Sequence, residues 1–207
     1  MVWLRFHCTR HTGSQVCLFT DMTLRIAGRR SLPIPAGARP TAGRVRQALF
    51  NILQGQVAGS RWLDLCAGSG SIGAEALCRH CHSVVGVEVS PQAARLLAQT
   101  WQRLAQPEQS IRVILADAGQ AVRDLAEQGW RFDFIYCDPP YHSPLYEHLL
   151  PQLPPLLTPT GTLIVEHHRH HPLGDPPGLV LWQQRHYGQT SLSFYQPADC
   201  EEISINS

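Results

Sequence analysis

The run Asp138-Pro139-Pro140-Tyr141 contains the side chains with the clearest potential for chemistry. It directly follows the apolar stretch FDFIYC (132–137), and two successive prolines cannot continue a strand, so the backbone leaves the strand in a rigid, extended form. The Asp138 carboxylate and a prolyl carbonyl then become fixed hydrogen-bond acceptors, with the Tyr141 ring beside them. Two such acceptors suit the exocyclic amine of a nucleobase, and the ring can stack on a base taken out of its helix.

A glycine-rich segment, residues 64–73, has the composition of a ligand-binding turn. Its candidate ligand contacts are Asp64, Gly68, Ser69, Gly70 and Gly73. Glycines permit a tight turn and close approach of a ligand to the backbone, and the helix that follows presents its N-terminal N–H groups. This spacing fits a dinucleotide equally well. The acidic residue decides between the two, because a carboxylate is unfavourable beside a pyrophosphate but can accept a hydrogen bond from an amino-acid ammonium. The segment therefore favours S-adenosylmethionine.

Two further acids stand where later strands are expected to end. Glu88 closes the stretch SVVGVEV (83–89), where a carboxylate can accept from both hydroxyls of a ribose. Asp117 follows IRVIL (111–115), where a short acidic side chain can accept from the amino group of adenine. Either residue alone could be a solvated loop residue. Together with Asp64 they indicate one site, since ligands of open parallel sheets bind beyond the carboxyl ends of the strands.

The elements that must position these residues follow a regular alternation. Strands are expected at 61–66, 83–89, 111–115, 132–137 and 161–167, and helices at 73–80, 91–104 and about 118–128. Such alternation predicts βαβ units and a mostly parallel sheet covered on both faces. Two last strands, 178–184 and 190–196, are separated by RHYGQ and predict a C-terminal antiparallel hairpin. The expected fold is α/β and Rossmann-like, with seven strands in the sheet.

A smaller unit precedes this domain. The text LRIAGRRSLPIP (24–35) predicts a small β-hairpin, and Thr41 is a plausible N-cap for a helix running to Gly55. We therefore expect a hairpin and helix over 22–58 and the main domain over 59–207. Residues 1–21 lack a periodic apolar face, and periodic sequence begins directly after Met22, so we expect them to be a non-essential extension.

Composition and charge restrict the class of protein. With 43% apolar and 16% charged residues, the 207-residue chain is expected to fold, and it has no apolar run of the roughly 18 residues that cross a bilayer. The chain contains no lysine: all 17 of its Lys and Arg residues are arginines. Residues 21–60 carry six arginines and one acid, a net charge of +5, whereas residues 61–207 carry nine arginines and 15 acids, a net charge of −6. The arginine-rich end predicts contact with a polyanion, because guanidinium groups bind phosphate bidentately.

These motifs resemble one branch of the amino-methylating, S-adenosylmethionine-dependent methyltransferases. The branch is the RsmD-type guanine-N2 methyltransferases of small-subunit (16S) ribosomal RNA. The resemblance runs from about Leu24 to Tyr195 and rests most specifically on RPTAGRVRQALFNIL (39–53), LDLCAGSGSIGAEAL (63–77) and FDFIYCDPPY (132–141). Departures include Gln47 where the family usually has glutamate, which puts a contact at that helix in doubt.

The resemblance implies a class I methyltransferase fold, a single S-adenosylmethionine and no metal. It places Thr41 and Arg44 near that cofactor and makes Asp138, Pro139, Pro140 and Tyr141 the catalytic motif. Four further arginines of the N-terminal segment, Arg25, Arg29, Arg30 and Arg39, are then candidates for binding RNA phosphates. The expected partner is 16S rRNA or the small ribosomal subunit, bound by a monomer.

The cysteine and histidine patterns have simpler interpretations than a further cofactor site. Seven cysteines without framework spacing and the absence of a secretory signal indicate a cytoplasmic protein with reduced thiols, in which Cys66 and Cys137 would be small core residues. The haem-attachment pattern Cys78-Arg-His-Cys81-His82 falls at a helix end, and the histidines of 167–171 are expected in a partly solvated loop. Two alternative functions stay open: a methyltransferase of another amine, such as adenine N6 in DNA or RNA, and a non-catalytic RNA-binding module.

Overall fold

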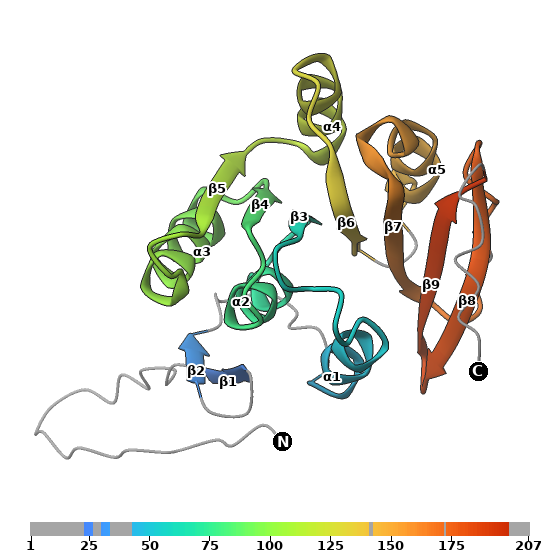
Figure 1. Ribbon diagram of the computed structural model, residues 1–207. Coiled ribbons are helices and arrows are strands. Elements are labelled where there is room, and N and C mark those ends of the chain that lie inside the picture. Colours follow the sequence, from blue (N-terminus) through green and yellow to red (C-terminus); the bar gives the residue numbers. More distant parts are fainter. Residues whose placement is uncertain (1–22, 27–29, 34–42, 141–142, 172, 199–207) are drawn as a thin grey trace, which may run out of the picture.

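The computed structural model describes residues 23–26, 30–33, 43–140, 143–171 and 173–198. Its main sheet has seven strands in the order β5-β4-β3-β6-β7-β9-β8 (Figure 1). The strands are β3 Arg61–Leu65, β4 Ser83–Glu88, β5 Ser110–Leu115, β6 Phe132–Cys137, β7 Leu157–His168, β8 Leu179–Tyr187 and β9 Thr190–Pro197. The first five pair in parallel, and β9 pairs antiparallel with both β7 and β8. The predicted α/β sheet with a C-terminal antiparallel hairpin is confirmed.

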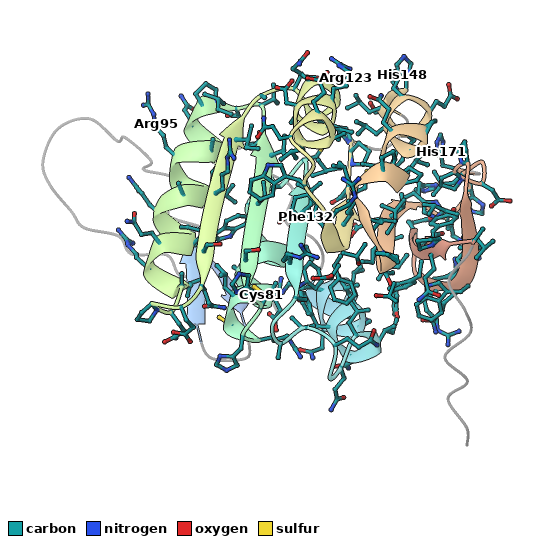
Figure 2. The ribbon with its side chains drawn as sticks, turned by 45° about the horizontal axis from the view of Figure 1, so that its top comes forward. Cys81, Arg95, Arg123, Phe132, His148 and His171 are labelled. Atoms are coloured by element: carbon teal, nitrogen blue, oxygen red, sulfur yellow. The ribbon has the colours of Figure 1, made fainter. Side chains whose placement is uncertain are left out.

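Helices cover both faces of the sheet. They are α1 Gly43–Ile52, α2 Ser71–Cys78, α3 Pro91–Leu104, α4 Ala118–Glu127 and α5 Leu145–Leu149, followed by 3-10 turns at Leu150–Gln152 and Pro154–Leu156. The first three helices pack on one face and α4 and α5 on the other, each with its own apolar core (Figure 1). Strand β3 shows why two cores form: Trp62 joins the first, and Leu63 and Leu65 join the second, since successive side chains of a strand point to opposite faces. Figure 2 shows side chains filling the space on either side of the sheet.

A separate two-stranded antiparallel hairpin, β1 Thr23–Ile26 and β2 Arg30–Pro33, precedes the main sheet. Its first strand lies near α2. The sequence predicts this hairpin within residues 24–35, and its first strand begins one residue earlier, at Thr23. Helix α1 follows and packs Phe50 on Trp62, with ring centroids 5.3 Å apart.

The clearest differences from the sequence-based expectation are in α2, β7 and α5; in addition, α1 ends at Ile52, before Gly55, and β8 extends beyond residue 184 to Tyr187. Helix α2 begins at Ser71, two residues earlier than predicted, because Gly70 adopts the left-handed conformation (φ 68°) and completes the turn before it. Strand β7 begins at Leu157, four residues early, and its pairing with β6 shifts register between Phe132 and Phe134. Helix α5 is absent from the prediction. No helix in the described ranges is long and apolar enough to span a membrane.

Candidate active site

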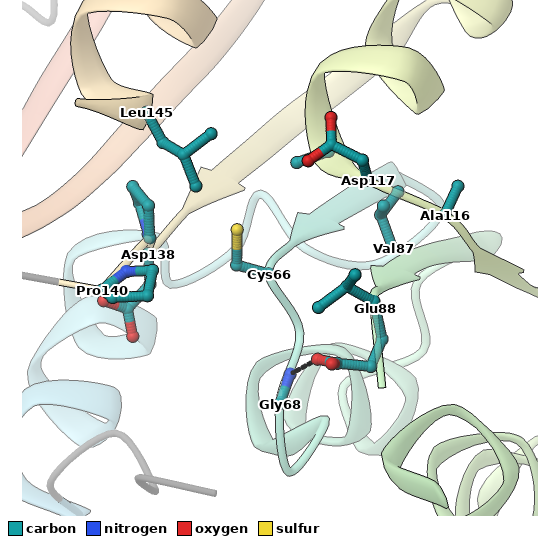
Figure 3. Close-up of a pocket in the computed structure, with 12 residues that line it drawn as sticks. Cys66, Gly68, Val87, Glu88, Ala116, Asp117, Asp138, Pro140 and Leu145 are labelled. Atoms are coloured by element: carbon teal, nitrogen blue, oxygen red, sulfur yellow. Dashed lines mark hydrogen bonds between the residues drawn. The ribbon is translucent and has the colours of Figure 1, made fainter. Parts of the chain in front are cut away.

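A pocket of about 450 Å³ lies at the carboxyl ends of β3, β4, β5 and β6, a volume in the range of cofactor sites (Figure 3). This is the switch point of the sheet, because the chain runs from β3 to β4 on one side while β6 pairs on the other side of β3. The pocket is lined by Cys66, Gly68, Val87, Glu88, Val89, Ala116, Asp117, Ala118, Asp138, Pro139, Pro140 and Leu145. Six of the thirteen residues predicted for catalysis or cofactor binding therefore share one cavity.

Glu88 is the most constrained acid of the pocket. One carboxylate oxygen accepts from the Gly68 amide at 2.9 Å (Figure 3), and the other accepts from the Ser90 amide at 2.8 Å. These bonds connect the end of β4 to the glycine-rich segment. Since a carboxylate has about four lone-pair sites, it retains acceptor capacity toward a ligand.

Asp117 caps helix α4. Its Oδ1 atom accepts from the amides of Gly119 at 2.9 Å and Gln120 at 3.3 Å, which satisfies N–H groups that the first turn of a helix leaves without partners. The residue is exposed and lines the pocket. Because the cap uses Oδ1, the second oxygen is available to accept from an amine in the pocket.

The motif after β6 has one half-buried acid and two prolines in different environments. Asp138 is half-buried and lines the pocket, Pro139 is buried, and Pro140 is exposed. The Pro139 carbonyl lies 3.1 Å from the Tyr146 hydroxyl, and the Pro140 carbonyl accepts from the Ser143 amide at 3.0 Å. The backbone that follows Asp138 is thus fixed by hydrogen bonds as well as by the proline rings.

Tyr146 connects this motif to a buried polar layer. Its hydroxyl also lies 2.9 Å from the carbonyl of Glu166, and its single proton serves one of the two carbonyls at a time. The Tyr136 hydroxyl donates to the Glu166 carboxylate on the same part of the sheet. The side chains of Tyr136, Tyr146 and Glu166 are all buried, so this group supports the motif from inside the protein.

Asp64 lies inside the protein, away from the pocket lining. It is 2% exposed, and its Oδ2 atom accepts from the Gly73 amide at 3.1 Å. Burial raises the pKa of Asp64 to about 8, with the Gly73 amide acting in the opposite direction and the Glu88 charge adding to the rise. The carboxyl group therefore holds the start of α2, and its contact with a ligand ammonium stays a prediction.

The three glycines of the segment differ in their surroundings. A Cβ atom at Gly68 (φ 52°) would have only the Cys66 carbonyl within 4 Å, at 3.8 Å, so this residue is open to the pocket. A Cβ atom at Gly70 or Gly73 would lie 2.0 Å from Leu97 or 2.1 Å from Trp101. The left-handed φ of Gly68 favours glycine at that position, and packing against Leu97 and Trp101 of α3 explains the other two glycines.

Several predicted site residues are placed elsewhere or lie outside the described residues. Ser69 is buried and does not line the pocket, and Arg44 is exposed on the first turn of α1. Thr41, Tyr141, Arg29 and Arg39 lie outside the described residues, and Arg25 and Arg30 are described only as backbone in β1 and β2. Their proposed contacts stay predictions.

Some pocket residues were not predicted from the sequence. Cys66, expected to be a small core residue, directly follows β3 with φ 59°; it packs against the second apolar core and also lines the pocket. Burial and the nearby acids raise the pKa of its thiol to about 12. Val89 is 70% exposed, and its place directly after Glu88 at a strand end was the available signal. Leu145 comes from α5, whose existence was not predicted.

The histidine run is less solvated than expected. His167 and His168 belong to β7, and His167 is buried, with Nδ1 near the carbonyls of His168 and His171 and Nε2 2.9 Å from the Ser193 hydroxyl. Two carbonyl neighbours identify Nδ1 as the protonated nitrogen. Within the described parts of the chain, no group of three or more His, Cys, Asp or Glu side chains is placed to hold a metal ion.

The sheet order, the glycine-rich turn and the acids at successive strand ends define a class I methyltransferase fold. The structure of the SAM-dependent methyltransferase from Agrobacterium tumefaciens matches with a TM-score of 0.67 over 88% of this chain and 72% of that one, at 16% identity, which shows the fold alone. The solved structure of yhhF from Escherichia coli matches with a TM-score of 0.73 at 29% identity, over 84% of this chain and 98% of that one.

The sequence comparisons identify the family. Residues 24–196 match the family model described as conserved hypothetical protein 95. Ribosomal RNA small subunit methyltransferase D of Haemophilus influenzae is 33% identical over 171 residues, which are 81% of this chain and 88% of the relative. The chain belongs to this family of methyltransferases, and the family resemblance seen in its motifs is confirmed.

Proposed function

We propose that the protein transfers a methyl group from S-adenosylmethionine to the exocyclic N2 amine of a guanine in small-subunit (16S) ribosomal RNA. The observation that carries the proposal is the meeting of Glu88, Asp117 and the Asp138-Pro139-Pro140 motif in one pocket at the switch point of the sheet. The rRNA substrate is supported by the relatives named ribosomal RNA small subunit methyltransferase D, and guanine N2 by the resemblance of the motifs.

The pocket suits S-adenosylmethionine in its charge and its shape. Glu88 would hold the ribose hydroxyls, and Asp117 would accept from the adenine amine. The adenine ring would pack against the apolar side chains of Val87, Val89 and Ala116. When bound, the cofactor supplies a methyl group on a positively charged sulfonium, and a pocket lined by three acids is favourable for that charge.

The residues after β6 would prepare the amine for reaction. The lone pair of a guanine amine is delocalised into the ring, so the amine is a poor nucleophile. Asp138 and a prolyl carbonyl would accept its two hydrogens and localise the lone pair on nitrogen. The nitrogen would take the methyl group as the bond from the methyl carbon to sulfur breaks. Asp138 would offset the positive charge that develops on nitrogen and would serve as the acceptor for its extra proton. The extra proton leaves the nitrogen after transfer.

The catalytic residues also restrict how the substrate can enter. The pocket lies at the carboxyl ends of the strands, so a base-paired guanine would have to leave its RNA helix to bring its amine beside Asp138. Tyr141 would stack on that base, and Arg25, Arg29, Arg30 and Arg39 would contact neighbouring phosphates without reading sequence. In this proposal, the RNA is bound by the unit that residues 22–58 form, and residues 1–21 are dispensable. The enzyme acts as a cytoplasmic monomer.

Transfer of labelled methyl from S-adenosylmethionine tests the proposal directly. Naked rRNA, assembled small subunits and duplex DNA would be offered side by side, and the products would be digested to nucleosides. We expect label in N2-methylguanosine from one or both rRNA substrates. Label in N6-methyladenosine would identify a methyltransferase of another amine, and binding of RNA without transfer to any substrate would identify a non-catalytic module.

A further inference from the structure

Trp101 of α3 contacts the glycine-rich segment and does not line the pocket. It is completely buried, and its indole Nε1–H donates to the Gly70 carbonyl at 2.9 Å. Gly70 is the residue that turns the chain into α2 in the left-handed conformation, at φ 68°. The Gly70 carbonyl thus accepts two hydrogen bonds, one from the Ala74 amide within α2 at 2.9 Å and one from Trp101, and the second joins this peptide to α3.

The indole also fills a recess made by glycines from two elements. A Cβ atom at Gly73 in α2 would lie 2.1 Å from Cζ2 of Trp101, and one at Gly86 in β4 would lie 2.6 Å from Cη2. At Gly70 the added atom would lie 2.9 Å from the indole nitrogen. All three distances are shorter than any ordinary contact between carbon, nitrogen and a Cβ atom, so the ring and the glycines are mutually dependent.

The segment that Trp101 holds carries the hydrogen bonds of the site. The Gly68 amide donates to Glu88, and the Gly73 amide donates to Asp64. The Gly70 amide donates to the Ala67 carbonyl at 2.7 Å, which closes the turn between them. A shift of the Gly70 carbonyl would therefore be passed to Gly68, the glycine of this segment that opens into the pocket.

We propose that Trp101 is a positioning residue for cofactor binding, which fixes the glycine-rich segment through its hydrogen bond to Gly70. The inference rests on the proposed function, because it takes S-adenosylmethionine as the ligand of the pocket. The indole then has two roles. The ring packs the core, and the N–H group holds the peptide that shapes the ligand site.

Trp62 provides a matched control. It is equally buried, belongs to the same apolar core, and its Nε1–H donates to the Ser60 hydroxyl at 2.8 Å, away from the glycine-rich segment. Trp101→Phe and Trp62→Phe remove the same kind of N–H group and the same part of a ring. Replacing each tryptophan by benzothienylalanine, in which sulfur takes the place of the N–H group, removes the hydrogen bond at nearly constant volume and covers the case in which a Phe variant fails to fold.

The test measures S-adenosylhomocysteine affinity by calorimetry, thermal unfolding, and amide hydrogen exchange of residues 67–73. We expect both positions to lose similar stability, whereas only the Trp101 variants should lose affinity, by about five-fold or more, and exchange faster in this segment. Equal affinity and equal exchange in the Trp101 and Trp62 variants would overturn the inference and leave the proposed function intact. A wild-type protein that fails to bind the ligand would overturn both.

Discussion

Glu88 serves the fold and the site with the same carboxylate. Each of its oxygens accepts one backbone N–H, from Gly68 and from Ser90, and in the proposed function the remaining lone pairs accept from the ribose hydroxyls. At 9% exposure the group is shielded from water that would otherwise compete with a diol. This arrangement makes the residue sensitive to substitution in two ways, through the shape of the glycine-rich segment and through direct contact.

Glu88→Ala is expected to weaken binding of S-adenosylmethionine strongly. Two hydrogen bonds to a charged acceptor contribute about 1.5–3 kcal/mol each, an upper bound because water can take their place. Calorimetric titration would measure the loss, with Glu127→Ala, an exposed carboxylate at the end of α4, as the control. Unchanged affinity in Glu88→Ala would remove Glu88 from the ribose site.

Tyr146→Phe is expected to slow methyl transfer with little effect on cofactor affinity. Its hydroxyl lies within hydrogen-bond distance of the Pro139 and Glu166 carbonyls, and without it the motif after Asp138 loses a buried support. We expect a reduction of about ten-fold in the single-turnover rate, roughly the cost of one hydrogen bond. Tyr195→Phe, buried in β9 and away from the pocket, is the matched control. Equal rates in the two variants would contradict this role.

At the scale of single residues, residue type and position beside a strand end were enough to predict that Glu88, Asp117 and Asp138 lie close together. The three side chains line one pocket. Residue type and position did not predict that Asp64 is buried against the Gly73 amide and outside the pocket lining, and its contact with a ligand ammonium stays a prediction. A strand alternates its faces, and the direction of the turn after Leu65 decides which acid reaches the pocket. That direction depends on the left-handed conformations of Cys66, Gly68 and Gly70, which a linear pattern does not reveal.

Among the elements, the βαβ units were predictable because their apolar periodicity is regular. Helix α5 was not, since Pro144, Pro151 and two further prolines interrupt the leucines of this region and leave only a short helix with two 3-10 turns. The hairpin at the end was predicted, but not the position of β9 between β7 and β8. Strand order depends on long-range pairing, which local sequence does not determine.

The β7–β9 pairing contains a group that should respond to acid. Burial lowers the pKa of His167, so the folded protein holds it neutral while the unfolded chain takes up a proton first as pH falls. Its contribution to stability is complete above about pH 6.5 and is lost as pH falls from there toward the lowered pKa. We therefore expect wild type to lose more stability than His167→Gln over this interval, by at most about 1.4 kcal/mol per pH unit.

The measurement that checks this is the difference in unfolding free energy between wild type and His167→Gln, obtained by chemical unfolding at several pH values. Asp64 acts in the opposite direction, because its raised pKa makes the folded state bind more protons between about 3.8 and 8, so stability falls as pH rises there. Asp64 is present in both proteins, and its effect cancels in the comparison. Parallel curves for wild type and His167→Gln would show that His167 does not titrate on unfolding.

At the scale of the whole molecule, charge is divided between the arginine-rich residues 21–60 and the acidic body. An acid-lined pocket suits a cationic cofactor, and a separate basic segment would be needed to hold a polyanion near it. Arg29→Gln with Arg30→Gln should flatten the dependence of RNA affinity on salt by about 0.7–0.9 log units per log unit of salt for each phosphate that is no longer bound. Cofactor affinity should not change.

Arg103→Gln with Arg131→Gln is the control for charge alone, since Arg103 lies in the last turn of α3, Arg131 directly precedes β6, and neither lines the pocket. Filter binding at several salt concentrations would measure both slopes. If the Arg29 and Arg30 variant keeps the wild-type slope, the RNA lies elsewhere, and the histidines near His171 are the next candidates.

The most direct test of the mechanism is the single-turnover rate of methyl transfer to rRNA by wild type, Asp138→Asn and Asp138→Ala, with S-adenosylhomocysteine affinity measured on each. Asp138→Ala removes the acceptor that would hold the amine, so its rate should fall by about 100-fold or more while cofactor affinity changes much less. Asp138→Asn retains a carbonyl acceptor without the charge, and its rate should lie between the other two. A folded Asp138→Ala protein that methylates guanine at the wild-type rate would contradict the mechanism.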